Sequence, residues 1–300
     1  MSLNPMSPTT DTNVPLAAAL IALMSFVFFS VLDASAKWLV IGGQAVIFVV
    51  WVRFTAQAIM LTVYYRGWSN ARLWRMENPL LQFVRGLLLP LMTLLNFTAL
   101  QYLQLAETIA VLLATPLLVA VLARPFLDER VGRQHWLAII LGFFGVLLVV
   151  KPGTAAFAWP TLFIIGSMVA YALYFLLTRK LAPSETPESL IFYSCIFATV
   201  LFAPFALVEA QMPARTSDWI AFGFACVAGM LGHMGIIKAS SLANASDIAP
   251  FGYTQVMWMT GIGFFIFGDV PGGLTLMGML VIAASGLYLM WLQRQRRTHS

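Results

Sequence analysis

The chain has 300 residues, of which 60% are apolar and only 10% are charged. Because a soluble domain carries about 25% charged residues, this chain has too few polar side chains to cover a water-soluble surface, and that class is excluded. The formal charge of +5 comes from residues in short segments between apolar runs, which indicates membrane topology and not nucleic-acid binding. Cys195 and Cys226 lie inside apolar runs, with no CxxC motif and no histidine cluster. We therefore predict no disulfide framework, no metal site and no cofactor.

Apolar runs of about 20 residues, the length that crosses a bilayer as a helix, recur along the whole chain. The segment before Pro15 contains no Lys or Arg. The first run is therefore predicted to be a retained helix, although Ala34-Ser35-Ala36 resembles a signal-peptide cleavage site. We predict an all-α integral membrane protein with ten transmembrane helices. The predicted spans are residues 15–38, 44–65, 79–101, 105–126, 133–151, 158–180, 188–209, 217–240, 246–268 and 272–292.

The Lys and Arg residues between these spans predict the orientation of the chain. If the N-terminus is cytoplasmic, twelve of them lie on the cytoplasmic side, and only Lys37, Lys151 and Arg215 lie on the other side. Because cytoplasmic loops are enriched in Lys and Arg, we expect a multi-pass protein of a bacterial-type cytoplasmic (inner) membrane. Both termini are predicted to be cytoplasmic.

An internal repeat is visible at an offset of about 140 residues. It consists of small or acidic residues that recur in the same order, and each half then contains five spans. The matched pairs are Ala99 with Ala239, Glu107 with Asp247, Glu129 with Asp269, and Ala138 with Gly278. Because an odd number of spans reverses the second half, the pattern predicts two inverted five-helix repeats, residues 15–151 and 158–292. Such halves can form equivalent inward-open and outward-open arrangements around one central site.

The motifs of the two halves resemble a known family. They are Leu105-Ala106-Glu107, Pro116, residues 127–132 and Trp136 in the first half, and residues 249–255, 267–271, Gly278 and residues 285–288 in the second. In this order they resemble the EamA family of the drug/metabolite transporter (DMT) superfamily, over residues 15 to 292. The resemblance implies a ten-helix inner-membrane carrier. Asp269 stands where the family more commonly has Glu. The resemblance does not fix the substrate, since the family includes exporters of amino acids and drugs and importers of S-adenosylmethionine, riboflavin and sugar phosphates.

Charged side chains inside the apolar runs are the first candidates for a site, because inserting each one costs at least ~2.5–3.5 kcal/mol. Arg53, near the middle of the second span, either holds a substrate carboxylate or phosphate through its planar donor fork or forms a structural ion pair. Asp33 and Lys37 are four residues apart and are expected to pair on one helix face; a zwitterionic substrate would exchange partners with such a pair. Arg85 is expected to be structural, with its side chain extending to the cytoplasmic headgroups.

Two acids and one histidine form a second group of candidates. Glu107 and Asp247 occupy equivalent helix starts, where acids act as helix caps. Their symmetry also suits paired gates on opposite membrane faces. His233 lies in a span among Gly229, Gly232 and Gly235, which let helices approach closely. It is either a packing residue or a functional one, as a proton carrier or a substrate contact.

Aromatic residues complete the candidate site. Tyr171 and Tyr174 share one face of the sixth span, and Tyr253 and Trp258 lie along the ninth. In the family that the chain resembles, these helices line the central cavity, so the four rings are candidate substrate contacts; the alternative is packing against helices or lipid. Prolines interrupt or begin helices and either act as hinges or serve helix packing. They are Pro90, Pro116, Pro204 and Pro250.

These observations predict a secondary transporter that moves a small metabolite by alternating access, surrounded by membrane lipid, as a monomer or homodimer. We favour export of an aromatic or neutral amino acid, because the candidates combine separate charged groups with aromatic rings. The alternative is an importer of a nucleoside-like or flavin-like metabolite of the S-adenosylmethionine or riboflavin type. A membrane-embedded enzyme is disfavoured, because the sequence contains no HExxH, GxSxG or paired-carboxylate motif.

Overall fold

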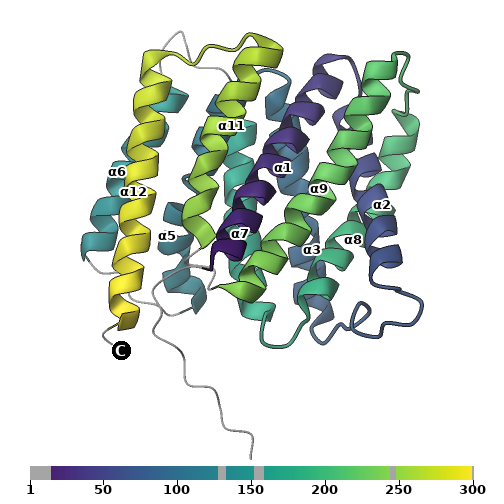
Figure 1. Ribbon diagram of the computed structural model, residues 1–300, viewed down its shortest axis with the longest axis horizontal. Coiled ribbons are helices and arrows are strands. Elements are labelled where there is room, and N and C mark those ends of the chain that lie inside the picture. Colours follow the sequence, from purple (N-terminus) through teal and green to yellow (C-terminus); the bar gives the residue numbers. More distant parts are fainter. Residues whose placement is uncertain (1–14, 128–132, 152–158, 244–247, 299–300) are drawn as a thin grey trace, which may run out of the picture.

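The computed structural model describes residues 15–127, 133–151, 159–243 and 248–298. Every regular element in these ranges is helical, and the helices run roughly along one common direction (Figure 1). The elements are α1 (Leu16–Ile41), α2 (Val46–Tyr64), α3 (Pro79–Leu100), α4 (Leu105–Leu112), α5 (Thr115–Leu127), α6 (Arg133–Val150), α7 (Thr161–Leu181), α8 (Pro187–Val208), α9 (Thr216–Leu242), the 3₁₀ helix η1 (Ala249–Thr254), α11 (Gln255–Ile262), the π-helix η2 (Gly263–Phe267) and α12 (Gly273–Thr298).

The described residues contain 8 helices that are long and apolar enough to cross a membrane. The prediction of an all-helical membrane protein is therefore confirmed. The fifth predicted span appears as a shorter apolar helix, Trp136–Val150, and the ninth is divided among η1, α11 and η2. The count of ten spans in two inverted repeats thus remains a prediction.

Two of the predicted spans are interrupted. The fourth is broken between α4 and α5, where Pro116 is the second residue of α5. The ninth begins as the 3₁₀ helix that contains Pro250. Proline has no N–H to donate and its ring prevents a regular preceding turn, which accounts for the break before α5. α4 and α11 also pack against each other, so the two interrupted segments are neighbours.

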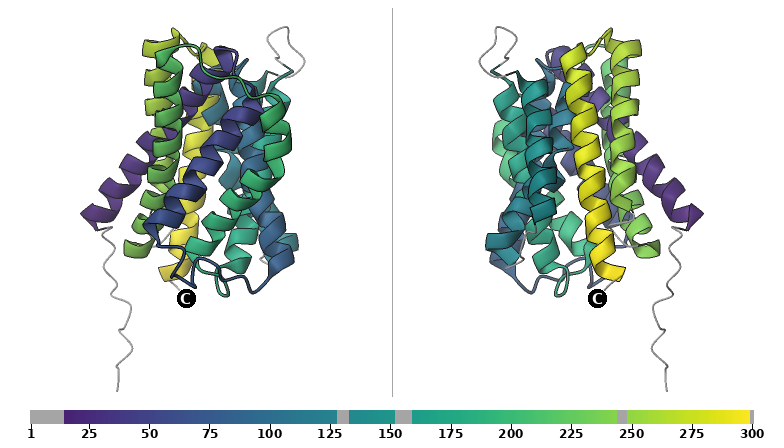
Figure 2. Two further views of the ribbon diagram at one scale, coloured as in Figure 1. Left: turned by 90° about the vertical axis from the view of Figure 1, so that its right-hand side faces the viewer. Right: turned by 90° about the vertical axis from the view of Figure 1, so that its left-hand side faces the viewer.

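The helices form four main packing pairs: α1 with α9, α3 with α7, α6 with α12, and α2 with α8. In Figure 1, α1 crosses the bundle between α11 and α9. Both side views show the first turns of α1 leaning away from the other helices (Figure 2). Large apolar side chains such as Phe144, Phe205 and Phe265 point outward and are more than half exposed. These exposed apolar faces account for the scarcity of charged residues in the sequence.

Candidate functional site

Arg53 of α2 lies at the centre of the helix bundle. Its side chain is buried, and one of its terminal nitrogens (Nη1) donates a hydrogen bond to Thr93 Oγ1 of α3 over 3.2 Å. The other terminal nitrogen (Nη2) lies 3.3 Å from Nε2 of His233 in α9. The guanidinium carbon is 4.3 Å from the centre of the Phe54 ring. Three helices therefore meet at one buried cation.

Asp33 of α1 supplies a negative charge to the same centre. Its Oδ1 accepts a hydrogen bond from Asn96 Nδ2 of α3 over 3.1 Å. Asp33 is close enough to Arg53 for the two charges to interact, but no hydrogen bond joins them in the described part of the chain. Asn96 is one turn beyond Thr93 on α3, so α3 presents both neutral polar groups on one face.

Several buried polar atoms around this centre have no hydrogen-bond partner among the described residues. They are Arg53 Nε, both amide atoms of Gln57, and Asn96 Oδ1. Gln57 is four residues after Arg53, so it lies on the same face of α2. Because more than nine in ten buried polar groups are normally hydrogen-bonded, this group of unpartnered donors and acceptors is where a polar ligand is expected. We call Asp33, Arg53, Gln57 and Asn96 the central polar site.

Arg85 of α3 is bound quite differently. Its Nε donates to Thr178 Oγ1 over 2.9 Å, and Nη2 donates to the hydroxyl of Tyr174 over 2.7 Å. Nη1 donates to the Leu190 carbonyl and to Ser194 Oγ. The expectation that Arg85 extends to the headgroups is wrong: the side chain is buried, because α7 and α8 provide acceptors within reach.

The aromatic pair on α7 has the predicted geometry. The rings of Tyr171 and Tyr174 are stacked, with centroids 6.2 Å apart and an angle of 24° between their planes. Arg85 lies against the face of Tyr174, 4.4 Å from the ring centroid. Tyr174 is thus held by a structural arginine, and both rings are only half-buried.

The predicted pairing of Lys37 with Asp33 is wrong. Its Nζ forms an ion pair with Asp269 Oδ2 over 2.6 Å and donates to the Leu103 carbonyl over 3.1 Å. It also lies 4.9 Å from the centre of the Phe267 ring. Asp269 reaches this position because Gly268 has a positive φ of 68°, a left-handed conformation that glycine adopts without strain. Lys37 is one turn nearer the end of α1 than Asp33, so it contacts this end of the bundle.

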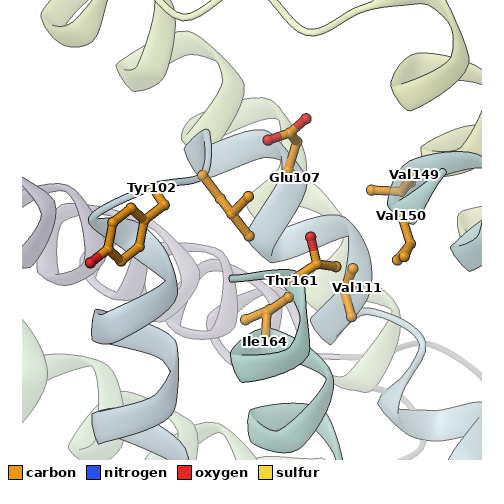
Figure 3. A pocket seen from close by; sticks show the side chains of 8 residues that line it. Tyr102, Glu107, Val111, Val149, Val150, Thr161 and Ile164 are labelled. Atoms are coloured by element: carbon orange, nitrogen blue, oxygen red, sulfur yellow. The ribbon is translucent and has the colours of Figure 1, made fainter. Parts of the chain in front are cut away.

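Glu107 caps α4 and also lines a cavity. Its Oε2 accepts the Gln104 N–H over 3.2 Å, and Gln104 and Glu107 form a capping box. The cavity has a volume of about 110 Å³ between α4, α6 and α7. In Figure 3 the Glu107 carboxylate and the Thr161 hydroxyl point to the same side. The capping prediction is therefore confirmed for Glu107. The paired acid, Asp247, lies outside the described residues.

The remaining aromatic candidates lie apart from the central polar site. Trp258 of α11 is 45% exposed, so its indole lies at the surface of the bundle. The hydroxyl of Tyr253 in η1 is buried, has no partner in the described residues and lies directly against Gly286 of α12. Of the eight predicted substrate contacts, the structure brings Asp33, Arg53 and His233 together.

The neutral residues in and beside the central polar site were not predicted. They are Gln57, Asn96 and Thr93, and neutral polar residues of this kind are common in membrane helices. A usable signal existed in their spacing: Gln57 is one helical turn from Arg53, and Asn96 is one turn from Thr93.

A bundle of membrane-spanning helices around a buried, incompletely hydrogen-bonded polar centre defines the class of polytopic membrane transporters. Comparison with known proteins gives the family. The EamA-like transporter family matches residues 16–151 and again residues 158–292, and the chain belongs to this family. One solved crystal structure covers 93% of this chain and 98% of its own with a TM-score of 0.63; at 18% sequence identity this likeness shows a shared fold alone.

The relatives differ in substrate. The S-adenosylmethionine uptake transporter of Rickettsia felis is 27% identical, with 91% of this chain and 92% of the relative covered. The pseudopaline exporter CntI of Pseudomonas aeruginosa is 26% identical, covering 91% and 95%. The riboflavin transporter of Vibrio cholerae is 28% identical, but the match spans only 61% of each chain. These relatives are thus transporters of different small molecules, one of them for uptake and another for export.

Proposed function

We propose that the protein is a secondary transporter that moves a small zwitterionic metabolite, one with a carboxylate and an amino group, across the cytoplasmic membrane by alternating access. Arg53 carries the proposal. It is a buried cation in mid-span with an unpartnered Nε, and it forms no ion pair in the described part of the chain. Because a buried charge requires compensation, a substrate carboxylate is the expected partner.

Asp33 supports a zwitterion over a simple anion. Its carboxylate and the Arg53 guanidinium carry opposite charges that are close but not hydrogen-bonded to each other. The substrate carboxylate would accept from Arg53, and the substrate amino group would donate to Asp33. The unpartnered amides of Gln57 and Asn96 would bind the remaining polar atoms. For a neutral amino acid, the two opposite charges of Arg53 and Asp33 then meet the two opposite charges of the substrate, and no charge is left uncompensated in the membrane.

The packing of the helices supports alternating access between inverted repeats. If α1, α2, α3 and α6 correspond to α7, α8, α9 and α12, exchanging the halves converts the α1–α9 pair into the α7–α3 pair. The α2–α8 and α6–α12 pairs are each converted into themselves. All four are main packing pairs, as a two-fold relation between the halves requires.

Two kinds of substrate with an amino-acid group are candidates. The first is an aromatic or neutral amino acid, moved outward, with the ring packing beside Tyr171 and Tyr174. The second is S-adenosylmethionine, moved inward, which combines an amino-acid group with a planar base. The uptake transporters that match over 91% of the chain favour the second candidate. Riboflavin has no amino-acid group and would leave Arg53 and Asp33 unmatched.

The test is counterflow in liposomes that contain the purified protein, with radiolabelled L-tryptophan, S-adenosylmethionine and riboflavin. We expect uptake of a compound with an amino-acid group, and little uptake of riboflavin. Arg53→Lys keeps the charge but removes the bidentate fork, and should reduce transport strongly while leaving thermal stability unchanged. Arg72→Lys in the exposed α2–α3 loop is the matched control. Riboflavin transport that tolerates Arg53→Lys would refute the proposal.

A further inference from the structure

The contact between Arg53 and His233 defines the protonation state of the imidazole. A guanidinium has only N–H donors and no acceptor. The 3.3 Å contact between Arg53 Nη2 and His233 Nε2 is therefore a hydrogen bond only if Nε2 carries a lone pair. This requires a neutral imidazole with its proton on Nδ1. An imidazolium would instead place a second positive charge towards Arg53 and Arg85, with Asp33 as the nearby counter-charge.

The guanidinium is confined on several sides besides this contact. Thr93 accepts from Nη1, and the Phe54 ring covers one face. Gly229 of α9 lies so close that a Cβ there would be 3.1 Å from Arg53 Nε. Glycine thus lets the α9 backbone approach the guanidinium. The acceptor at Nε2 sets the direction of Nη2, and this direction determines where the rest of the donor fork points.

The imidazole is itself held in place by α1. The Phe29 ring meets it edge-on, with centroids 5.1 Å apart and an angle of 72° between the planes. Phe29 in turn packs against Gly232, where a Cβ would be 2.7 Å from the ring. His233 thus connects Phe29 on α1 to Arg53 on α2 from its own position on α9.

We propose that His233 is a positioning residue: as a neutral Nδ1–H tautomer, it orients the Arg53 guanidinium for the carboxylate of the substrate and does not itself bind the substrate. This inference rests on the proposed function of Arg53. It predicts that loss of the acceptor at Nε2 weakens substrate binding and leaves the rate of the conformational cycle unchanged.

Three variants separate the acceptor from the shape of the side chain. His233→Gln places an amide oxygen near the position of Nε2. His233→Asn places its oxygen near the position of Nδ1, and this shorter side chain does not reach Arg53. His233→Leu has a similar bulk but no acceptor. In the counterflow assay with labelled L-tryptophan or S-adenosylmethionine, we expect KM to rise about tenfold in the Leu and Asn variants at unchanged Vmax. The Gln variant should stay near the wild type. If His233 has only a packing role, the Leu variant should transport normally and the Gln variant should not. That result would overturn the proposal.

A second measurement reads the tautomer without any substrate. The full-length protein is labelled with ¹⁵N-histidine, and the His233 signal is assigned by its loss in His233→Gln. We expect a protonated Nδ1 and an unprotonated Nε2 at neutral pH. A protonated Nε2 would overturn the proposal even if every variant failed to transport. Normal transport by Arg53→Lys together with the expected tautomer would instead refute the proposed function and leave the hydrogen bond intact.

Discussion

The two buried arginines of this protein differ in how far the protein itself satisfies them. Both Arg53 and Arg85 are 2% exposed, and both lie against an aromatic ring. Arg85 donates from all three of its nitrogens to a carbonyl and three hydroxyl groups of α7 and α8. Arg53 has only two polar contacts among the described residues, with Thr93 and His233, and an unpartnered Nε.

If the proposed function holds, this difference separates a structural cation from one that binds substrate. A buried polar group that loses its partner costs about 1–3 kcal/mol, so a protein under selection for stability alone would complete the bonds of both arginines. Arg85 shows that this chain can do so within a membrane helix. Under the proposed function, the substrate carboxylate would complete the bonding of Arg53.

The largest expected effect is the loss of stability in Arg85→Met. The substitution leaves the partners on α7 and α8 without their donor and should lower the free energy of unfolding by roughly 3 kcal/mol. Thermal melting of the purified protein in detergent measures this effect. A melting temperature equal to that of the wild type would break the comparison, because Arg85 would then not be structural.

Arg53→Met should show the reverse pattern. Stability is expected to change by less than about 1 kcal/mol, because the two lost hydrogen bonds are offset by removal of the unpartnered Nε. Substrate affinity should fall about 30-fold, equivalent to roughly 2 kcal/mol for lost hydrogen bonds to a charged group. Binding is measured by scintillation proximity with the compound found in the liposome assay. Equal destabilisation by the two Met variants would remove the distinction.

Lys37 extends the comparison to a third buried cation, one with a full ion pair at one end of the bundle. The pair with Asp269 joins α1 to the segment between η2 and α12, and the bond to the Leu103 carbonyl joins α1 to the segment before α4. Under the predicted orientation this end faces outward. Asp269→Asn should therefore favour the outward-open state, and a change of ~1.4 kcal/mol alters the ratio of states tenfold.

Accessibility of Thr108→Cys, a fully buried position on α4, measures this opening once Cys195 and Cys226 are replaced by Ala. An impermeant thiol reagent should label the cysteine faster in the Asp269→Asn background. Gln211→Cys in the exposed loop between α8 and α9 is the reference for the maximal rate of labelling. Unchanged labelling of Thr108→Cys would show that the ion pair only stabilises the fold.

The sequence predicted the helices well, because runs of about 20 apolar residues leave a chain few alternatives in a bilayer. It also identified Arg53, since a lone charge in such a run is conspicuous. It did not predict the division of the ninth span into three helical types, although Pro250 marked its start. Local spacing was also misleading: Asp33 and Lys37 are one turn apart, yet Lys37 pairs with a residue 232 positions away. No local pattern encodes such a tertiary contact.

The smallest expected effect is that of Glu107→Gln. The sequence left two roles open for Glu107 and Asp247, helix caps or paired gates, and loss of a gate on the outward side would favour the outward-open state. The carboxylate caps α4 through the Gln104 N–H and lines the cavity that Leu103 also lines. Leu103 in turn accepts the bond from Lys37. Because glutamine keeps an acceptor for the cap and loses only the charge, the shift should be about 0.5 kcal/mol, a little over twofold. The same Thr108→Cys labelling assay compares Glu107→Gln directly with Asp269→Asn. A tenfold or larger increase for Glu107→Gln would make Glu107 the main gate and the Lys37–Asp269 pair secondary to it.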